Sequence, residues 1–306
     1  MIVTCTLNPS LDCYMEFNDE IKEGRVNRSV LEYYEAGGKG INVSVVLNNL
    51  GVPTKAYGFL GGFVKDFYLS LLSKYERIEP NFTYIEGNTR INLKLIHEDT
   101  DTDLNACGPY ITDEAMENLR AKVSRLDEGD YFALCGNTQP NLNESVKEMV
   151  QELQDAKVKV ILATNYDLLI TLLDKKPFLV KITDDELHKY YDDLEDAKDY
   201  GRIAKELREK GAENVLVVYD NEKTVLSCEM GEFTCKFAHD DVVNSVGVGD
   251  SLVAGFLMNY IRSRDVVDSF RFGSACGSAT AYSKTLATRE KVDTYYQEVE
   301  VRKLND

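Results

Sequence analysis

Short runs of apolar and β-branched residues recur along the chain and are typical of strands that are buried on both faces. They cover residues 2–7, 57–60, 131–135, 158–163, 178–182 and 215–219. Between them, residues 40–50, 113–126 and 143–156 carry apolar side chains at helical spacing. Strands that alternate with helices predict a doubly wound α/β fold, in which helices sandwich a mainly parallel sheet.

Two segments, residues 12–34 and 81–105, alternate polar and apolar residues without a helix between their strands. This pattern predicts antiparallel strands that form a small accessory sheet, placed as a lid over a ligand. Ordinary edge strands of the main sheet are the alternative. The sequence shows no internal repeat and no linker rich in Pro, Gly or Ser. We therefore expect residues 1–306 to form a single domain.

The chain is strongly acidic, with a formal net charge of -17. Such a surface repels phosphate backbones and anionic lipids, so we expect neither a nucleic-acid partner nor a membrane partner. A phosphate site in this chain must therefore carry local positive charge.

The composition also argues against several other classes. The seven cysteines form no CxxC pair and only three histidines are present, which argues against a zinc site or a disulfide framework. No apolar run approaches the roughly 18 residues of a membrane span, and the N-terminus lacks a basic signal-peptide region. We expect a cytoplasmic protein.

The strongest chemical motif lies at residues 244–251, where Gly247 and Gly249 precede Asp250 and a helical pattern begins. The first N–H groups of a helix have no internal partners and carry partial positive charge, so this turn can stabilise a phosphoryl group. A carboxylate at the same turn can accept the proton of an attacking hydroxyl. The alternative is that Asp250 only caps the helix.

A second glycine-rich turn, residues 37–44, also opens a helix, and here Lys39 supplies the positive charge that an anion site requires. Its spacing is not that of the P-loop, which excludes a Walker-type ATPase at this segment. A third candidate, Asp12, follows the first strand, where parallel sheets present ligand-binding groups. A lone Asp at such a place is more often a cap.

Together these motifs resemble the ribokinase-like (pfkB) carbohydrate kinase family. The matching segments occur in order over nearly the whole chain, at residues 6–12, 37–44, 89–94, 244–250, 275–283 and 286–290. Within that family, the residues of these segments most resemble the 1-phosphofructokinase branch, and the tagatose-6-phosphate kinase branch is the next most similar. The resemblance implies an α/β/α sandwich with a β-sheet lid, and it makes a homodimer through the lid a candidate assembly.

The resemblance also implies roles for individual residues. The catalytic groups would be one base and a backbone anion hole, formed by Asp250, Gly247, Val248 and Gly249. The sugar phosphate would be bound by Asp12, Gly38, Lys39, Asn42 and Arg90. Among these, Lys39 and Arg90 would neutralise the phosphate already on the sugar, and Arg90 suits a bidentate contact.

The nucleotide side departs from the family pattern. The usual Lys-Pro-Asn-x-x-Glu-Leu run ends a strand here as Lys181-Ile182-Thr183-Asp184-Asp185-Glu186-Leu187, and the loop at residues 218–223 lacks its usual glycines. ATP would be contacted by Lys181, Glu186, Val218, Asp220, Lys223 and Gly277. Glu186 would also help to place Mg²⁺ through water.

Two interpretations follow from this uneven match. In the first, the protein is an ATP-dependent kinase that converts fructose 1-phosphate to fructose 1,6-bisphosphate, with tagatose 6-phosphate as the alternative acceptor. In the second, it is a sugar-phosphate sensor with impaired turnover. The first is favoured because Asp250 and its anion hole, which act in the transition state, are retained. A purely structural protein would not explain why Lys39, Arg90 and Asp250 occur together.

Overall fold

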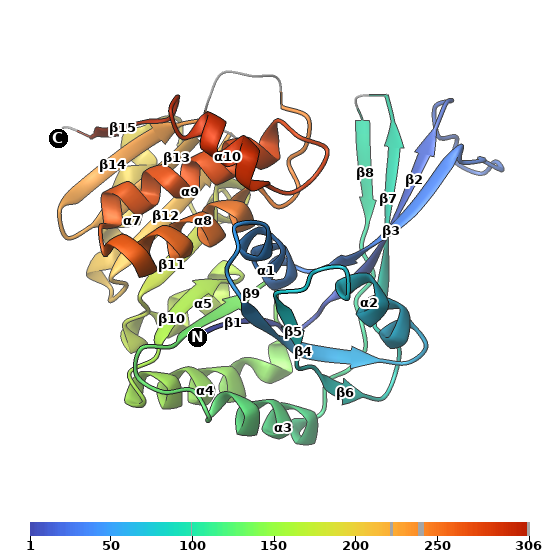
Figure 1. Ribbon diagram of the computed structural model, residues 1–306, viewed down its shortest axis with the longest axis horizontal. Helices are drawn as coiled ribbons and strands as arrows, with labels where there is room; N and C mark the ends of the chain where they lie inside the picture. The colour runs from blue at the N-terminus through green and yellow to red at the C-terminus, as the bar shows by residue number, and fades with distance from the viewer. Residues whose placement is uncertain (99, 221–222, 238–241, 305–306) are drawn as a thin grey trace.

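The computed structural model describes the chain except for residues 99, 221–222, 238–241 and 305–306 (Figure 1). The main sheet has a parallel centre. In spatial order this centre contains β12 (Asn214–Tyr219), β11 (Leu179–Thr183), β10 (Lys159–Ala163), β9 (Tyr131–Cys135), β1 (Ile2–Thr6), β4 (Thr54–Gly61) and β5 (Ile78–Pro80). The strands expected from the apolar runs are thus confirmed, with ends that differ by a few residues.

Further strands extend this sheet at both sides. β6 (Thr83–Ile85) pairs in parallel with β4. Beyond β12, the sheet continues through the antiparallel strands β13 (Lys223–Cys228), β14 (Gly231–Lys236) and β15 (Glu300–Lys303).

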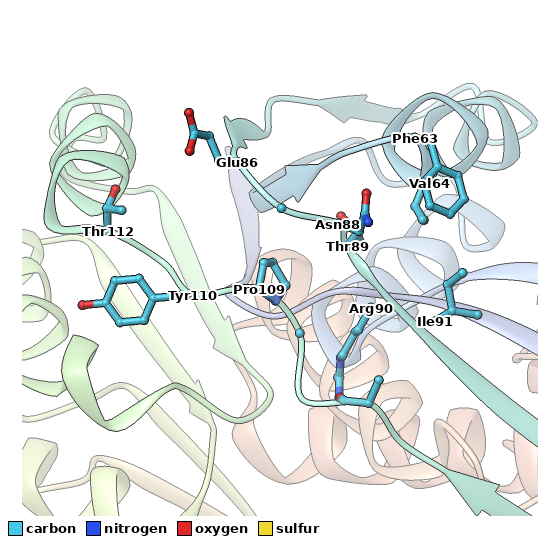
Figure 2. Close-up of a pocket in the computed structure, with 13 residues that line it drawn as sticks. Phe63, Val64, Glu86, Asn88, Thr89, Arg90, Ile91, Pro109, Tyr110 and Thr112 are labelled. Atoms are coloured by element: carbon cyan, nitrogen blue, oxygen red, sulfur yellow. The ribbon is translucent and has the colours of Figure 1, made fainter.

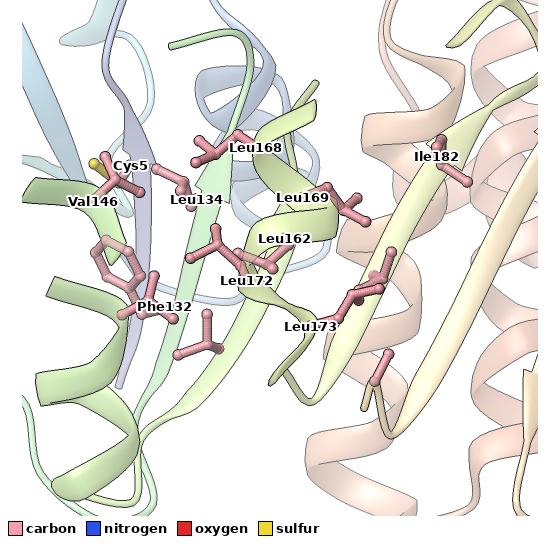
Figure 3. Close-up of a cluster of buried hydrophobic side chains, with 14 of the residues drawn as sticks. Cys5, Phe132, Leu134, Val146, Leu162, Leu168, Leu169, Leu172, Leu173 and Ile182 are labelled. Atoms are coloured by element: carbon pink, nitrogen blue, oxygen red, sulfur yellow. The ribbon is translucent and has the colours of Figure 1, made fainter. Parts of the chain in front are cut away.

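Helices cover both faces because successive strand residues point to opposite sides. Phe132 and Leu134 of β9 point into one apolar cluster, whereas Ala133 and Cys135 point into the other. The first cluster (Figure 3) is covered by α3 (Asp113–Val123), α4 (Asn143–Asp155), α5 (Tyr166–Leu172) and α7 (Ala197–Glu209). The second is covered by α1 (Lys39–Asn49), α8 (Val248–Ser263), α9 (Val266–Ala281) and α10 (Arg289–Tyr295). The predicted sandwich is confirmed.

A separate sheet projects from this body, as Figure 1 shows, and we call it the lid. Its strands, in spatial order, are β3 (Leu31–Gly37), β2 (Ser10–Phe17), β7 (Arg90–His97) and β8 (Thr100–Leu104). Strands β2 and β3 reach beyond the expected segment 12–34, to Ser10 and Gly37. β6 lies within the segment 81–105 but belongs to the main sheet.

The expectation of purely antiparallel lid strands is wrong at the centre of the lid, where β2 and β7 run parallel. The reason lies in the connections. β2 follows the parallel strand β1 and β7 follows the parallel strand β6, so both leave the main sheet in the same direction.

The two faces of the lid differ in chemistry. The register places Ser10, Asp12 and Tyr14 beside Arg90, Asn92 and Lys94 on one face. The other face carries Leu11, Cys13, Met15, Ile91, Leu93 and Leu95. Along β7 the polar face is the more buried one, since Asn92 is only 4% exposed but Ile91 is 38% exposed, whereas on β2 both faces are buried, with Leu11 at 4% and Asp12 at 9%. None of the helices in the described part of the chain is both long and apolar enough to cross a membrane.

Candidate active site

The carboxyl end of β1 is the point where the strand order of the main sheet changes direction, since β1 lies between β4 and β9. Such switch points leave a crevice where ligands bind in open α/β sheets. The start of α1 packs onto this end of β1. A Cβ at Gly40 would lie 2.5 Å from Thr6 Oγ1, and Gly38, with φ of 131°, holds the N-cap position. Glycine therefore lets the N–H groups of α1 open beside the strand end.

The start of α8 meets the same region. Gly247, with φ of 79°, is the N-cap residue of α8, and no side chain of the described residues caps this helix. The alternative that Asp250 is the cap is therefore wrong. Asp250 is the third residue of the helix and is 5% exposed. Asn42 of α1 donates a hydrogen bond of 2.8 Å from Nδ2 to Asp250 Oδ2, which joins the two helix starts.

Burial raises the pKa of Asp250, against the lowering effect of the Lys181 and Lys39 charges and of the Asn42 hydrogen bond. Burial also lowers the pKa of Lys181, which is 4% exposed on β11, and the charge of Lys39 acts in the same direction. A Cβ at Gly249 would lie 2.5 Å from Lys181 Cε, so glycine is needed there for the lysine to lie against the helix start. For both Asp250 and Lys181, the loss of hydration on burial therefore has a larger effect on the pKa than the attraction between their opposite charges.

A second polar group surrounds Asp12 on the lid. Ser10 Oγ donates to Asp12 Oδ1 at 2.7 Å, and Asn92 Nδ2 donates to the same oxygen at 3.0 Å. The other oxygen, Oδ2, lies 2.2 Å from the position of a Cβ at Gly37, next to the start of α1. Burial raises the pKa of Asp12, opposed by the Ser10 and Asn92 hydrogen bonds and by the charges of Lys94 and Arg90.

Arg90 is the third candidate group for the acceptor side. Its Nη1 donates to the carbonyl oxygen of Ala106 at 3.2 Å, and its Nη2 donates to that of Asn8 at 3.0 Å. Its Nε is buried and has no hydrogen-bond partner in the part of the chain that the structure describes. Burial lowers the pKa of Arg90, while the charge of Asp12 raises it. The guanidinium is held in place from two sides.

Not all nucleotide-side candidates come together. Glu186 Oε2 accepts hydrogen bonds from the Thr183 N–H and Oγ1, both at 3.3 Å, in a capping box that starts α6 (Asp184–Leu187). Thr183, where the family usually has Asn, thus serves as a helix cap. Glu186 also acts electrostatically on Asp250 and Lys181.

The remaining candidates have other partners. The Asp220 N–H donates to Asp184 Oδ2 at 2.8 Å, and Lys223 pairs with Asp220 at 2.7 Å. Val218 is buried in the apolar cluster beneath α8 and α9. Gly277 lies under an aromatic ring, because a Cβ there would be 2.5 Å from Phe237 Cζ.

A pocket of about 700 Å³ lies beside the base of the lid (Figure 2). Arg90 lines it together with apolar residues such as Phe63 and Pro109, but Asp250, Lys39 and Asp12 do not. The buried polar groups around Asp12 and Asp250 therefore define the candidate active site better than this pocket does.

Ser10, Asn92 and Lys94 surround Asp12 in the structure, although no motif in the sequence marks them. The signal was the two-residue period of a strand, since Arg90, Asn92 and Lys94 share one face with Asp12. Lys94 is 9% exposed and pairs with Asp103 across the lid.

The family model for the pfkB family carbohydrate kinase matches residues 11–291. The chain belongs to the pfkB family. A relative of this pfkB kinase, the 1-phosphofructokinase of Bacillus subtilis, is 36% identical and aligns over 99% of this chain and 100% of its own. The D-tagatose-1-phosphate kinase of Bacillus licheniformis is 29% identical over 99% and 100% of the two chains. The name of this relative places the phosphate on C1, whereas the motif resemblance predicts tagatose 6-phosphate as the alternative acceptor.

Among solved structures, phosphofructokinase-2 from Escherichia coli in complex with substrates and products superposes on this pfkB kinase with a TM-score of 0.90. The two chains share 23% identity, and the match covers 97% of this chain and 98% of the other. At this identity the likeness supports the shared fold.

The pKa of Asp12 gives a test of the site's electrostatics. Because burial raises this pKa above its ordinary 3.8, ionisation of Asp12 destabilises the folded state as pH rises from about 3.8 through the raised value. Asp12→Asn stays neutral and keeps an acceptor for Ser10 and Asn92. We expect Asp12→Asn to raise the free energy of unfolding of this pfkB kinase at about pH 7.5. The gain should disappear near pH 4. Urea denaturation at the two pH values measures both free energies. If the variant is less stable than wild type at about pH 7.5, the hydrogen bonds and positive charges around Asp12 stabilise its ionised form by more than burial destabilises it.

Proposed function

We propose that this pfkB kinase transfers the γ-phosphate of ATP to the C6 hydroxyl of fructose 1-phosphate, giving fructose 1,6-bisphosphate. The relative with 36% identity over 99% of this chain is named for that substrate class. The observation that carries the chemistry is the buried Asp250 carboxylate at the start of α8, held by Asn42 beside Lys181 and Lys39.

In this proposal Asp250 accepts the proton of the attacking hydroxyl. The backbone N–H groups of Gly247, Val248 and Gly249 at the start of α8 stabilise the negative charge on the phosphoryl group in flight. A base whose pKa is raised by burial takes up a proton more readily, which suits this step.

The acceptor would lie between α1 and the lid. Asp12 and Asn42 would hold sugar hydroxyls, and Gly38 allows the sugar to approach the backbone of α1. Lys39 and Arg90 would neutralise the phosphate of the substrate and overcome the repulsion from a chain of net charge -17. Among the described residues, the carbonyls of Ala106 and Asn8 use one hydrogen of each Nη of Arg90, which leaves further N–H groups for this purpose.

ATP with Mg²⁺ is the expected donor in this family. Among the described residues no three His, Cys, Asp or Glu side chains gather into a metal cage. Glu186 fits a contact through water, since the Thr183 bonds use only its Oε2. Mg²⁺ commonly keeps several waters and takes its other ligands from substrate phosphates. When bound, it would neutralise charge on those phosphates, and Lys181 would add a fixed positive charge beside Asp250.

Two alternatives retain support. The relative with 29% identity acts, by name, on D-tagatose 1-phosphate, so this ketohexose phosphate is a second candidate acceptor. The sensor interpretation is favoured by contacts that use up groups expected to meet ATP. Asp220 contacts Asp184 and Lys223, and the Phe237 ring lies on Gly277.

All seven cysteines are free thiols, which suits action in the reducing cytoplasm.

Asp250→Asn tests the proposed function directly. Purified protein should release ADP with MgATP and fructose 1-phosphate, and the variant should lose about 10²–10⁴-fold in kcat because a general base contributes that much. Fructose 1-phosphate affinity should remain close to that of wild type. The matched control is Asp268→Asn, since Asp268 is also the third residue of its helix. Tight binding of fructose 1-phosphate without ADP release from wild type would favour the sensor, and an active Asp250→Asn enzyme would remove Asp250 as the base.

The pH dependence of kcat tests the neighbours of Asp250. Lys181 lowers the pKa of Asp250, so Lys181→Met should move the acid limb of the kcat profile to higher pH. Titration of the substrate phosphate is common to both enzymes and cancels in the comparison. Lys159→Met, at the opposite end of the adjacent strand β10, serves as control and should leave the limb in place. A limb that is unmoved in Lys181→Met would show that Lys181 does not act on the base.

We further propose that the apolar face of the lid pairs with a second copy of the chain. Leu93 stands between Cys13 and Leu104 in the register, and Leu104 is 50% exposed. Exposed apolar sheet faces of this kind commonly mark protein interfaces.

Light scattering on the eluting protein tests this assembly. Wild type should be a dimer, and Leu95→Lys should convert it to a monomer of 34.6 kDa because a charge would be buried in the interface. Ile96→Lys, one residue along the same strand and on the opposite face, is the matched control and should remain dimeric. A monomeric wild type, or a dimeric Leu95→Lys protein, would reject the lid interface.

A further inference from the structure

We infer that Asn92 is a positioning residue, which fixes the spacing between the sugar-binding carboxylate of Asp12 and the phosphate-binding guanidinium of Arg90. This inference rests on the proposed function for the roles of Asp12 and Arg90. The role of Asn92 itself follows from the hydrogen bonds of its side chain.

Both ends of the Asn92 amide are occupied by protein. Its Nδ2 donates to Asp12 Oδ1 at 3.0 Å, and its Oδ1 accepts from the Ala106 N–H at 3.1 Å. The residue is 4% exposed. A side chain that is buried and committed at both ends acts through its partners and does not need to touch the substrate.

The segment that Asn92 holds is residues 106–108, which we call the strap. The strap binds Arg90 through the Ala106 carbonyl, at 3.2 Å from Nη1. It also binds Asn8, whose Nδ2 donates to the Cys107 carbonyl at 2.9 Å. Asn8 in turn holds the other side of the guanidinium through its own carbonyl, at 3.0 Å from Arg90 Nη2. In Figure 2 the Arg90 side chain runs beside the segment that precedes Pro109.

Asn92 therefore closes a continuous path from Asp12, through the backbone N–H and carbonyl of Ala106, to Arg90. At the Asp12 end, Ser10 and Asn92 share Oδ1, which leaves Oδ2 as the oxygen that can accept a sugar hydroxyl. At the other end, both Nη atoms of Arg90 are oriented by main-chain carbonyls. A phosphosugar that reaches from Oδ2 to the guanidinium meets two groups whose separation is set before it binds, which reduces the entropy cost of binding.

The competing explanation is that Asn92 only satisfies buried polar groups of the lid. That role would change stability, but it would not couple Asn92 to Arg90 in ligand binding. A double-mutant cycle separates the two explanations, because residues that act in one network show non-additive effects.

The experiment measures fructose 1-phosphate binding by calorimetry, without nucleotide, in the full-length protein. Asn92→Ala should weaken binding about 10-fold, which is about 1.4 kcal/mol. Ser10→Ala is the matched control, because Ser10 bonds the same Asp12 oxygen but does not touch the strap, and it should weaken binding less. In an Arg90→Ala background the loss from Asn92→Ala should shrink to that of Ser10→Ala, whereas the Ser10→Ala loss should be unchanged.

Additive losses for Asn92→Ala and Arg90→Ala, with each protein folded by circular dichroism, would overturn the inference. If Asn92→Ala does not fold, Asn92→Gln keeps a donor and an acceptor without adding charge but lengthens the side chain, so it changes the spacing between Asp12 and the strap. Its loss should also be coupled to Arg90→Ala, and additive losses would contradict the proposed path. In an active kinase the KM for ATP should not change in any Asn92 variant. Because fructose 1-phosphate binding is measured without ATP, a protein that lacks kinase activity can still show whether Asn92 and Arg90 are coupled. The two proposals can therefore fail independently.

Discussion

The burial of the Asp250 carboxylate is the constraint on which the rest of the site depends. An ionised carboxylate removed from water costs several kcal/mol unless other groups compensate it. Here the compensation comes from the start of α8, the Asn42 amide and the charges of Lys181 and Lys39, and it is incomplete, since the pKa of Asp250 remains raised. A carboxylate left in this state is poorly solvated and ready to take a proton. Burial also lowers the pKa of Lys181 by more than the charge of Asp250 raises it. The fold, and not the attraction between Asp250 and Lys181, therefore keeps these two side chains together.

This arrangement explains why glycines stand at both helix starts. Gly249 leaves room for the Lys181 side chain, and Gly40 leaves room for the end of β1 at Thr6, so that two positive helix ends and a lysine share one small region. Asn42 then ties α1 to α8 through Asp250. The global charge of -17 would repel a phosphosugar, but Coulomb forces between exposed charges fade within about 8–10 Å in salt, whereas the buried local groups are screened much less. Local geometry therefore decides what binds.

Much of this could be predicted from the sequence, for identifiable reasons. The buried strands have runs such as Tyr131–Cys135 that carry no charged residue, and the glycines before Asp250 signal a helix start. The parallel pairing of β2 with β7 could not be predicted, because it depends on where β6 joins the main sheet. The Asn42 to Asp250 bond joins residues 208 positions apart, and no local pattern encodes it. The contacts of Gly277 with Phe237 likewise arise from tertiary packing.

The two halves of the site differ in how their polar groups are used. On the acceptor side, hydrogen bonds within the protein orient Asp12 and Arg90 and leave Asp12 Oδ2 and several guanidinium hydrogens for a ligand. On the donor side, the Asp220 N–H is taken by the Asp184 carboxylate, so a nucleotide phosphate at that position would have to displace a charge-assisted hydrogen bond. For a nucleotide bound as proposed, such competition would weaken ground-state binding, yet it leaves Asp250 and the start of α8 untouched. Under the proposed function, the physical consequence would be an enzyme whose weakness lies in affinity for the donor, since the groups proposed to act on the transition state are intact.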